Sequence, residues 1–181
     1  MRTYELNVAG VTRQLPILNI SNELAIAAFV ILGDAELTQK TAIALAEKAP
    51  RDVEILMTAE TKGIPLVIEM ARALNMNRYV VARKSIKGYM NNVIFVEDFS
   101  ITTKGKQMLY VADDDINLIK GKKVLLVDDV ISTGGSMKAL KTLAEKAGAK
   151  VIGQAAILAE GDAKNRDDII FLEDLPLFKA E

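Results

Sequence analysis

One stretch decides the fold, and it reads Val124-Leu125-Leu126-Val127-Asp128-Asp129-Val130-Ile131-Ser132-Thr133-Gly134-Gly135-Ser136. Its first four residues are apolar on both faces of a strand, which is typical of a parallel strand buried inside a sheet. Two acidic residues, a turn rich in hydroxyls and glycines, and the start of a helix follow. The stretch therefore predicts a strand–turn–helix unit of an α/β protein.

The turn carries groups that suit a phosphate. Glycines let the backbone curl so that N–H groups point at an anion, and the first N–H groups of a helix have no partner within the helix. We therefore assign a phosphate to Ile131, Ser132, Thr133, Gly134, Gly135 and Ser136. Asp128 and Asp129 would repel it, so we assign them to a vicinal diol or to magnesium-bound water. A phosphate beside a diol describes a ribose 5-phosphate.

Strands and helices alternate along the chain, which predicts a mostly parallel sheet covered by helices on both faces. Helices are expected at Asp34–Lys48, Thr61–Leu74 and Gly134–Ala147. Strands are expected at Val53–Thr58, Arg78–Ala82, Lys122–Asp128, Val151–Leu158 and Ile169–Leu172. An N-terminal hairpin is expected at Tyr4–Val8 with Val11–Leu18. An antiparallel excursion is expected at Asn91–Phe99 with Lys106–Ala112, and a polar connection at Asp113–Gly121.

Composition excludes several classes of protein. The 181 residues suit one domain, and the absence of histidine and cysteine excludes a Ser-His-Asp triad, a cysteine nucleophile and the usual zinc ligands. A metal here would be hard and oxygen-liganded, as Mg2+ is. A net charge of −1 gives no basic surface for nucleic acid. No apolar run approaches the roughly 20 residues of a membrane span, and no secretion signal is visible, so a cytoplasmic location is expected.

The opening stretch resembles the phosphoribosyl pyrophosphate signature of the type I phosphoribosyltransferases: an apolar strand, Asp-Asp, two apolar residues, a small residue, Thr-Gly-Gly and Ser or Thr. The resemblance covers roughly residues 50–160. It implies that family's fold, catalytic roles for Asp128 and Asp129, phosphoribosyl pyrophosphate and a purine base as substrates, Mg2+ and a homodimer. A response-regulator receiver lacks the Thr-Gly-Gly, and a dinucleotide-binding domain requires a Gly-x-Gly-x-x-Gly that this sequence does not contain.

Two further segments resemble parts of the family's pyrophosphate site. Met57–Gly63 resembles the pyrophosphate loop of the purine enzymes, in which a cis peptide would fall at Glu60–Thr61. Ala82–Gly88 resembles the Arg-Lys-x-x-Lys stretch of the adenine and xanthine enzymes. The pyrophosphate-binding residues implied are Glu60, Thr61, Lys62, Gly63, Arg83, Lys84 and Lys87. The alternative interpretations are an ordinary helix start with an exposed lysine, and a solvated basic loop.

The resemblance divides the single domain into a hood at 1–33 that binds the base, a core at 34–160 and a tail at 161–181. The hood candidate is Leu15–Leu32, although its apolar part, Ala25–Leu32, better suits the core of a helix. The base pocket would also use residues after the strand that ends near Glu160. Thr102–Lys106 would lie in a flexible antiparallel loop that closes over the reaction.

Adenine is the favoured base because the Glu60–Gly63 loop and the Arg83-Lys84 pair resemble the adenine enzymes. Xanthine, hypoxanthine or guanine is the alternative, since Thr102-Thr103 stands where adenine enzymes usually have Glu-Tyr. A non-catalytic regulator that senses phosphoribosyl pyrophosphate is the alternative from another class. The sequence thus predicts a purine salvage enzyme.

Overall fold

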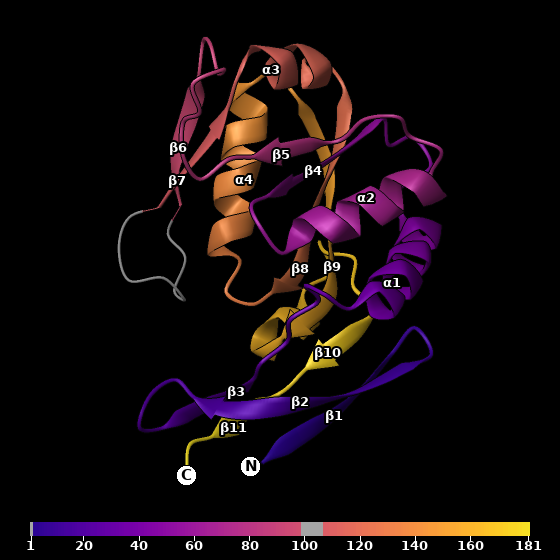
Figure 1. Cartoon of the computed structure of the whole chain (residues 1–181), viewed down its shortest axis with the longest axis vertical. Helices are drawn as coiled ribbons and strands as arrows, with labels where there is room; N and C mark the ends of the chain where they lie inside the picture. Colours follow the sequence, from indigo (N-terminus) through magenta and orange to yellow (C-terminus); the bar gives the residue numbers. More distant parts are fainter. Residues whose placement is uncertain (1, 99–106) are drawn as a thin grey trace.

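A five-stranded parallel sheet forms the centre of the computed structural model, which describes residues 2–98 and 107–181 (Figure 1). Its strand order is β10-β9-β8-β4-β5, and every neighbouring pair is parallel. The strands are β4 (Ile55–Ala59), β5 (Val80–Ala82), β8 (Lys123–Ile131), β9 (Lys150–Glu160) and β10 (Glu173–Leu175). The α/β class and the mostly parallel sheet predicted from the sequence are confirmed.

Different elements cover the two faces of this sheet. Helices α1 (Ala35–Lys48) and α2 (Gly63–Ala73) pack on one face, where Leu45 and Leu66 are completely buried. Helix α4 (Gly135–Lys146) and the antiparallel pair β6 (Ile94–Asp98) and β7 (Gln107–Val111) cover the other face. The helices and the antiparallel excursion were expected from the sequence, but Thr102–Lys106 lies outside the described residues.

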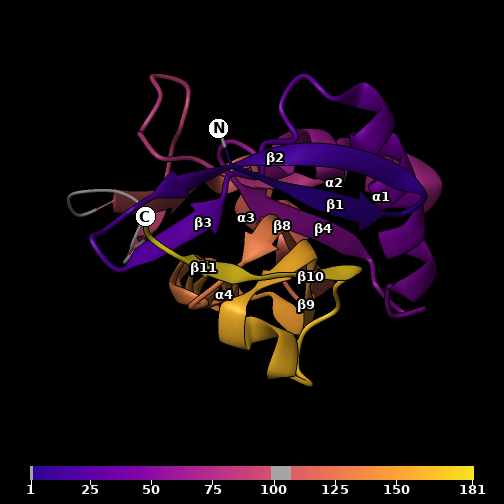
Figure 2. The same cartoon turned by 90° about the horizontal axis from the view of Figure 1, so that it is seen from below.

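A second, antiparallel sheet in the order β1-β2-β3-β11 lies across one end of the core (Figures 1 and 2). Its strands are β1 (Thr3–Val8), β2 (Val11–Asn19), β3 (Leu24–Ala27) and β11 (Leu177–Lys179). The expected hairpin turns at Ala9-Gly10, where both residues have positive φ. The end of the chain returns to pair with β3, so this sheet, which we call the hood sheet, contains both termini.

The prediction of a helix in Ala25–Leu32 is wrong, because Leu24–Ala27 form strand β3 of the hood sheet. Ser21 begins a turn in which its hydroxyl accepts the N–H groups of Glu23 and Leu24. From Leu24 the side chains alternate between part-exposed and buried, with the period of two that defines a strand. Pairing with β2 and β11 on either side satisfies the backbone, which a sequence-local pattern cannot reveal.

The polar connection expected at Asp113–Gly121 is instead helix α3 (Asp113–Ile119). Three consecutive aspartates fill its first turn, where negative charge interacts favourably with the helix dipole. Ile119 is fully buried and anchors the helix on the core. The acidic run therefore marks a helix start.

Several strand boundaries also differ from the expectations, and two of these differences bear on the sheet. Strand β8 continues past Asp128 to Ile131, since β9 pairs with it as far as Ala159. The strand expected at Ile169–Leu172 lies further on, as β10, and Ile170 forms only an isolated parallel bridge with Ala155. Between β9 and β10 runs a short 3-10 helix, η1 (Gly161–Asn165). Within the described ranges, no helix has the length and apolar character to cross a membrane.

Removing residues 176–181 should loosen the hood sheet without unfolding the core. This truncation takes away β11, the antiparallel neighbour of β3, and the tilted packing of Phe178 on Tyr4. Hydrogen exchange at the β3 amides should accelerate at least tenfold, while exchange in β8 and β9 stays unchanged and serves as the internal control. Unchanged exchange in β3 would show that β11 contributes nothing to the hood.

Candidate functional site

Four parallel strands end at one cavity of about 450 Å³. Ala59 of β4, Ile131 of β8, Glu160 of β9 and Leu175 of β10 all line it, at the sheet edge where open α/β proteins bind ligands. Residues 26–29, from β3 onwards, line it from the hood side. The lining residues are Ile26, Ala27, Ala28, Phe29, Ala59, Glu60, Thr61, Lys62, Lys84, Gln107, Asp128, Asp129, Val130, Ile131, Ser132, Thr133, Gly134, Gly135, Ser136, Met137, Glu160 and Leu175.

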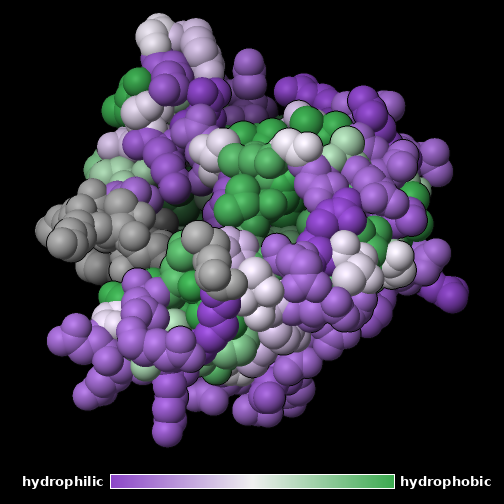
Figure 3. Space-filling view, turned by 60° about the horizontal axis from the view of Figure 1, so that its bottom comes forward, coloured by the Kyte–Doolittle hydropathy of each residue, from purple (hydrophilic) through white to green (hydrophobic). Residues whose placement is uncertain are grey.

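The space-filling view in Figure 3 shows a face that is hollowed near its centre. Apolar side chains gather there, within a surface that is otherwise mostly hydrophilic. A partly apolar hollow with a few polar groups is the usual form of a small-molecule site.

The turn between β8 and α4 has the geometry of an anion site. Gly134 caps the helix in a left-handed conformation, with φ 85°, and no side chain caps the free N–H groups of the first turn. The first backbone bond of the helix runs from the Lys138 N–H to the Gly134 carbonyl. The amides of Gly135 and Ser136 are therefore not used by the helix ladder, and both residues line the cavity. All six residues predicted for the phosphate lie together here.

Two neighbouring carboxylates lie beside this turn. Asp129 is only 3% exposed, and Asp128 is somewhat less buried and lines the cavity. The Asp129 N–H donates to Oδ1 of Asp128 over 2.8 Å. Burial, and then the charge of Asp129, raise the pKa of Asp128 well above the usual range of an aspartate. In the ligand-free protein, Asp128 therefore keeps its proton to a higher pH than an ordinary aspartate does.

Lys62 balances the buried Asp129. Its Nζ lies 2.8 Å from Oδ2 of Asp129, an oxygen that receives no well-aligned hydrogen bond within the described residues. The lysine side chain is nearly half exposed and also lines the cavity. Its ammonium is thus shared between the acid pair and the open space where a ligand would lie.

The Glu60–Thr61 peptide is cis, as the resemblance predicted. Glu60 joins this loop to the loop that follows β5. Its carboxylate accepts hydrogen bonds from the Lys84 backbone N–H at 2.7 Å and from the Arg83 Nε at 2.6 Å. Burial opposes ionisation of Glu60, but the Lys84 amide and the Arg83 guanidinium outweigh it and lower its pKa. Glu60, Thr61, Lys62 and Lys84 line the cavity together.

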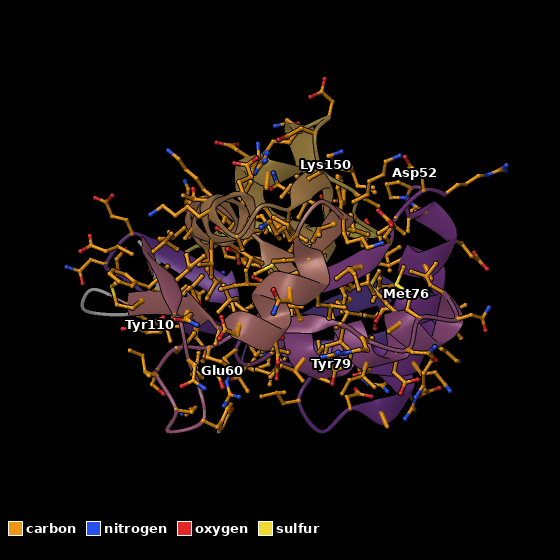
Figure 4. The ribbon with its side chains drawn as sticks, turned by 90° about the horizontal axis from the view of Figure 1, so that it is seen from above. Asp52, Glu60, Met76, Tyr79, Tyr110 and Lys150 are labelled. Atoms are coloured by element: carbon orange, nitrogen blue, oxygen red, sulfur yellow. The ribbon has the colours of Figure 1, made fainter. Side chains whose placement is uncertain are left out.

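Three residues predicted for pyrophosphate lie outside the cavity wall. The Arg83 guanidinium donates to the Glu60 carboxylate and to the Tyr89 hydroxyl. The backbone of Arg83 pairs with that of Tyr110 (Figure 4 labels Glu60 and Tyr110). The Lys87 ammonium lies 2.6 Å from the Ser85 hydroxyl. The third residue, Gly63, packs so closely that a Cβ would lie 2.0 Å from Oγ1 of Thr58. The structure gives it a packing role, because only glycine fits there.

Sequence reasoning missed five lining residues: Ala59, Gln107, Val130, Met137 and Leu175. Val130 lies within the quoted stretch, Met137 directly follows it, and Ala59 lies within Met57–Gly63, so proximity to the assigned residues was a usable signal. Gln107 directly follows Thr102–Lys106, the predicted closing loop, and so had the same signal, whereas Leu175 had none because folding alone brings it to the cavity.

Comparison with known proteins identifies relatives of one kind. The family model described as "Phosphoribosyl transferase domain" matches residues 34–175. A hypoxanthine/guanine phosphoribosyltransferase of Ferroglobus placidus is 34% identical over 133 residues, which are 74% of this chain and 67% of that protein. An adenine phosphoribosyltransferase of Leuconostoc citreum is 30% identical over 141 residues, which are 77% of each chain.

Solved structures share the fold at lower identity. The adenine phosphoribosyl transferase of Trypanosoma brucei, in complex with AMP, pyrophosphate and ribose 5-phosphate, is 21% identical with a TM-score of 0.62, covering 80% of this chain and 67% of that one. The adenine enzyme of Thermoanaerobacter pseudethanolicus is 22% identical with a TM-score of 0.63, covering 80% and 84%. At these identities the likeness shows the arrangement of the chain.

Asp128→Asn should stabilise the ligand-free protein. Because the folded state raises the pKa of Asp128, it binds the proton more tightly than the unfolded chain does, and stability falls as pH rises above the usual aspartate range. Asparagine removes that loss and can still accept the Asp129 N–H. We expect Tm at pH 8 to rise by about 2–6 °C, with less gain at pH 5.

The matched control is Asp52→Asn, at an exposed aspartate whose pKa is lowered by the hydrogen bond and charge of Lys123. Its Tm should stay level or fall slightly. Scanning calorimetry at pH 5, 7 and 8 measures both variants. A Tm for Asp128→Asn at or below that of the parent protein at pH 8 would contradict the raised pKa.

Proposed function

Because this chain belongs to the phosphoribosyltransferase family, we propose that it transfers the 5-phosphoribosyl group of phosphoribosyl pyrophosphate to a purine base and releases pyrophosphate. The observation that carries the proposal is the meeting of an uncapped glycine turn, two adjacent carboxylates and a lysine in one cavity. These groups match a phosphate, a ribose diol and a pyrophosphate, the three parts of one substrate. The relatives from Ferroglobus placidus and Leuconostoc citreum are also named as purine phosphoribosyltransferases.

The glycine turn would hold the 5-phosphate. The unused amides at the start of α4 and the hydroxyls of Ser132, Thr133 and Ser136 supply the hydrogen bonds, and the helix dipole adds partial positive charge. Because these donors are fixed by the fold, they bind the phosphate without further ordering. This end of the substrate is thereby anchored while the other end reacts.

Asp128 and Asp129 would bind the ribose hydroxyls and stabilise the reacting carbon. As the bond to pyrophosphate breaks, positive charge develops on the ribose, and nearby carboxylates stabilise that charge. In the free protein burial, and then the charge of Asp129, raise the pKa of Asp128, so the protonation state of Asp128 matters for how it binds the ribose hydroxyls.

Lys62 and Lys84 would bind the pyrophosphate, together with the backbone of Thr61. Lys62 must then leave Asp129 for the pyrophosphate, which frees the carboxylate for the ribose. Arg83 would act indirectly, by holding Glu60 and so the shape of the loop. A direct role for Lys87 in binding pyrophosphate stays a prediction.

Magnesium fits this donor set only with help from the substrate. The described part of the chain has no group of three or more metal-binding side chains, but Asp128 and Asp129 offer hard oxygen ligands beside the expected pyrophosphate. Such an ion would share its ligands between those acids and phosphate oxygens. Bound there, it would neutralise charge on the leaving pyrophosphate.

The purine would lie between the hood sheet and the end of β9. Ile26 and Phe29 offer apolar surface, and the Glu160 carboxylate offers an acceptor for an N–H group of the base. Adenine is the base favoured by the sequence. Hypoxanthine and guanine are the second candidates, favoured by the name of the Ferroglobus placidus relative. The homodimer and the cytoplasmic location stay predictions.

A base panel tests the proposed activity. The protein is incubated with phosphoribosyl pyrophosphate, Mg2+ and, in turn, adenine, hypoxanthine, guanine, xanthine, uracil and orotate, and the nucleotides are separated by chromatography. At least one purine should be converted more than tenfold faster than uracil or orotate. Binding of phosphoribosyl pyrophosphate without conversion of any base would instead favour a regulator.

Asp129→Asn should lower kcat by more than tenfold while the fold survives. The change removes the buried charge that stabilises the ribose, and the exposed Lys62 can turn to solvent when it loses its partner. Asp52→Asn, at an exposed aspartate that pairs with Lys123 and is off the cavity wall, is the matched control and should keep the parent rate. Parent-like turnover of Asp129→Asn with every accepted base would remove Asp129 from the mechanism.

A further inference from the structure

An arginine from the C-terminal part of the chain lies against the glycine turn. A Cβ built on Gly134 would lie 2.9 Å from Nη1 of Arg166, so this guanidinium closely approaches the residue that caps α4. Arg166 directly follows η1 and is absent from the cavity wall. It therefore faces the turn from beside the cavity.

Asp168 fixes the orientation of this guanidinium. Its two carboxylate oxygens accept hydrogen bonds from Nε and Nη2 of Arg166, at 2.8 and 2.7 Å. This bidentate arrangement occupies one edge of the planar guanidinium. The remaining nitrogen, Nη1, is the one directed at Gly134. The pair thus forms a dipole whose positive end faces the turn.

The turn has no cation of its own. From Val124 to Met137 the sequence contains no lysine or arginine. Its positive potential comes from free amides and the dipole of α4, which are partial charges. Arg166 adds a full charge next to Gly134, in the same direction as that dipole, and it is only about one-third exposed. Its partner Asp168 is more than half exposed, and an ion pair this open to solvent contributes little to stability, so the feature lacks a strong structural reason.

We propose that Arg166 is a positioning residue for the 5-phosphate, acting through the glycine turn. It packs against Gly134, limits how far the turn can open, and adds positive potential where the phosphate binds. Asp168 orients the arginine and occupies two of its nitrogens, so that the third faces the turn. The inference rests on the proposed function, because it requires a phosphate in this turn.

The test compares Arg166→Met, which keeps the aliphatic stem, with Arg166→Lys, which keeps the charge. Lys164→Met is the matched control: it removes one positive charge from the same segment, where Lys164 contacts Asp174 instead of the turn. Titration calorimetry measures the Kd of ribose 5-phosphate and of pyrophosphate at two salt concentrations. Steady-state kinetics then gives KM for phosphoribosyl pyrophosphate and kcat.

Arg166→Met should weaken binding of ribose 5-phosphate by about five- to twentyfold, the effect of one partly screened charge near an anion. Its pyrophosphate affinity should change less than twofold, and KM should change more than kcat. The salt dependence of ribose 5-phosphate binding should become shallower. Arg166→Lys should recover most of the loss, and Lys164→Met should match the parent protein.

Parent-like affinity of Arg166→Met for ribose 5-phosphate overturns the inference and leaves the proposed function standing. Equal losses for ribose 5-phosphate and pyrophosphate, with a lower Tm, also overturn it, because they indicate a structural role. A parent protein that binds no ribose 5-phosphate and converts no purine contradicts the proposed function itself. The failures are therefore distinguishable.

Discussion

The ion pair between Lys62 and Asp129 is the interaction on which the site depends. Strand β8 carries two adjacent carboxylates into a place where Asp129 is almost completely buried, and a buried charge without a partner is strongly unfavourable. Lys62 enters from the residue before α2, so the pair joins the β4–α2 loop to β8. It neutralises the site in the absence of a ligand and offers both charges to a ligand. The exposure of Lys62 lets it change partners with little loss of packing.

The loops around the cavity are held in place by contacts of charged side chains. Glu60 joins the cis-peptide loop to the loop after β5 through Arg83 and Lys84, and Asp168 holds Arg166 against the turn. In both cases one charged group orients another, which in turn fixes a loop backbone. The cavity therefore combines a half-exposed cation, Lys62, with fixed backbone donors. This division suits an anchored phosphate at one end and a leaving pyrophosphate at the other.

Local features were predictable from the sequence, whereas features made by distant segments were not. The run Val124–Ser136 contains its own strand, turn and helix start, and its residues lie together as predicted. By contrast, β3 exists because β2 and β11 pair with it, and Leu175 reaches the cavity only because β10 pairs with β9. The sequence showed the charge of Arg83 but not that its guanidinium contacts Glu60, 23 residues away. A sequence pattern shows which groups are present, but tertiary contacts decide which of them are committed to one another.

The most direct measurement is a crystal structure of the protein with ribose 5-phosphate, pyrophosphate and magnesium. The account predicts a phosphate within hydrogen-bond distance of the amides at Gly135 and Ser136, ribose hydroxyls on Asp128 and Asp129, and the Lys62 ammonium moved from Asp129 to the pyrophosphate. A complex with the glycine turn empty, or with Lys62 still on Asp129 while both ligands are bound elsewhere, would contradict it.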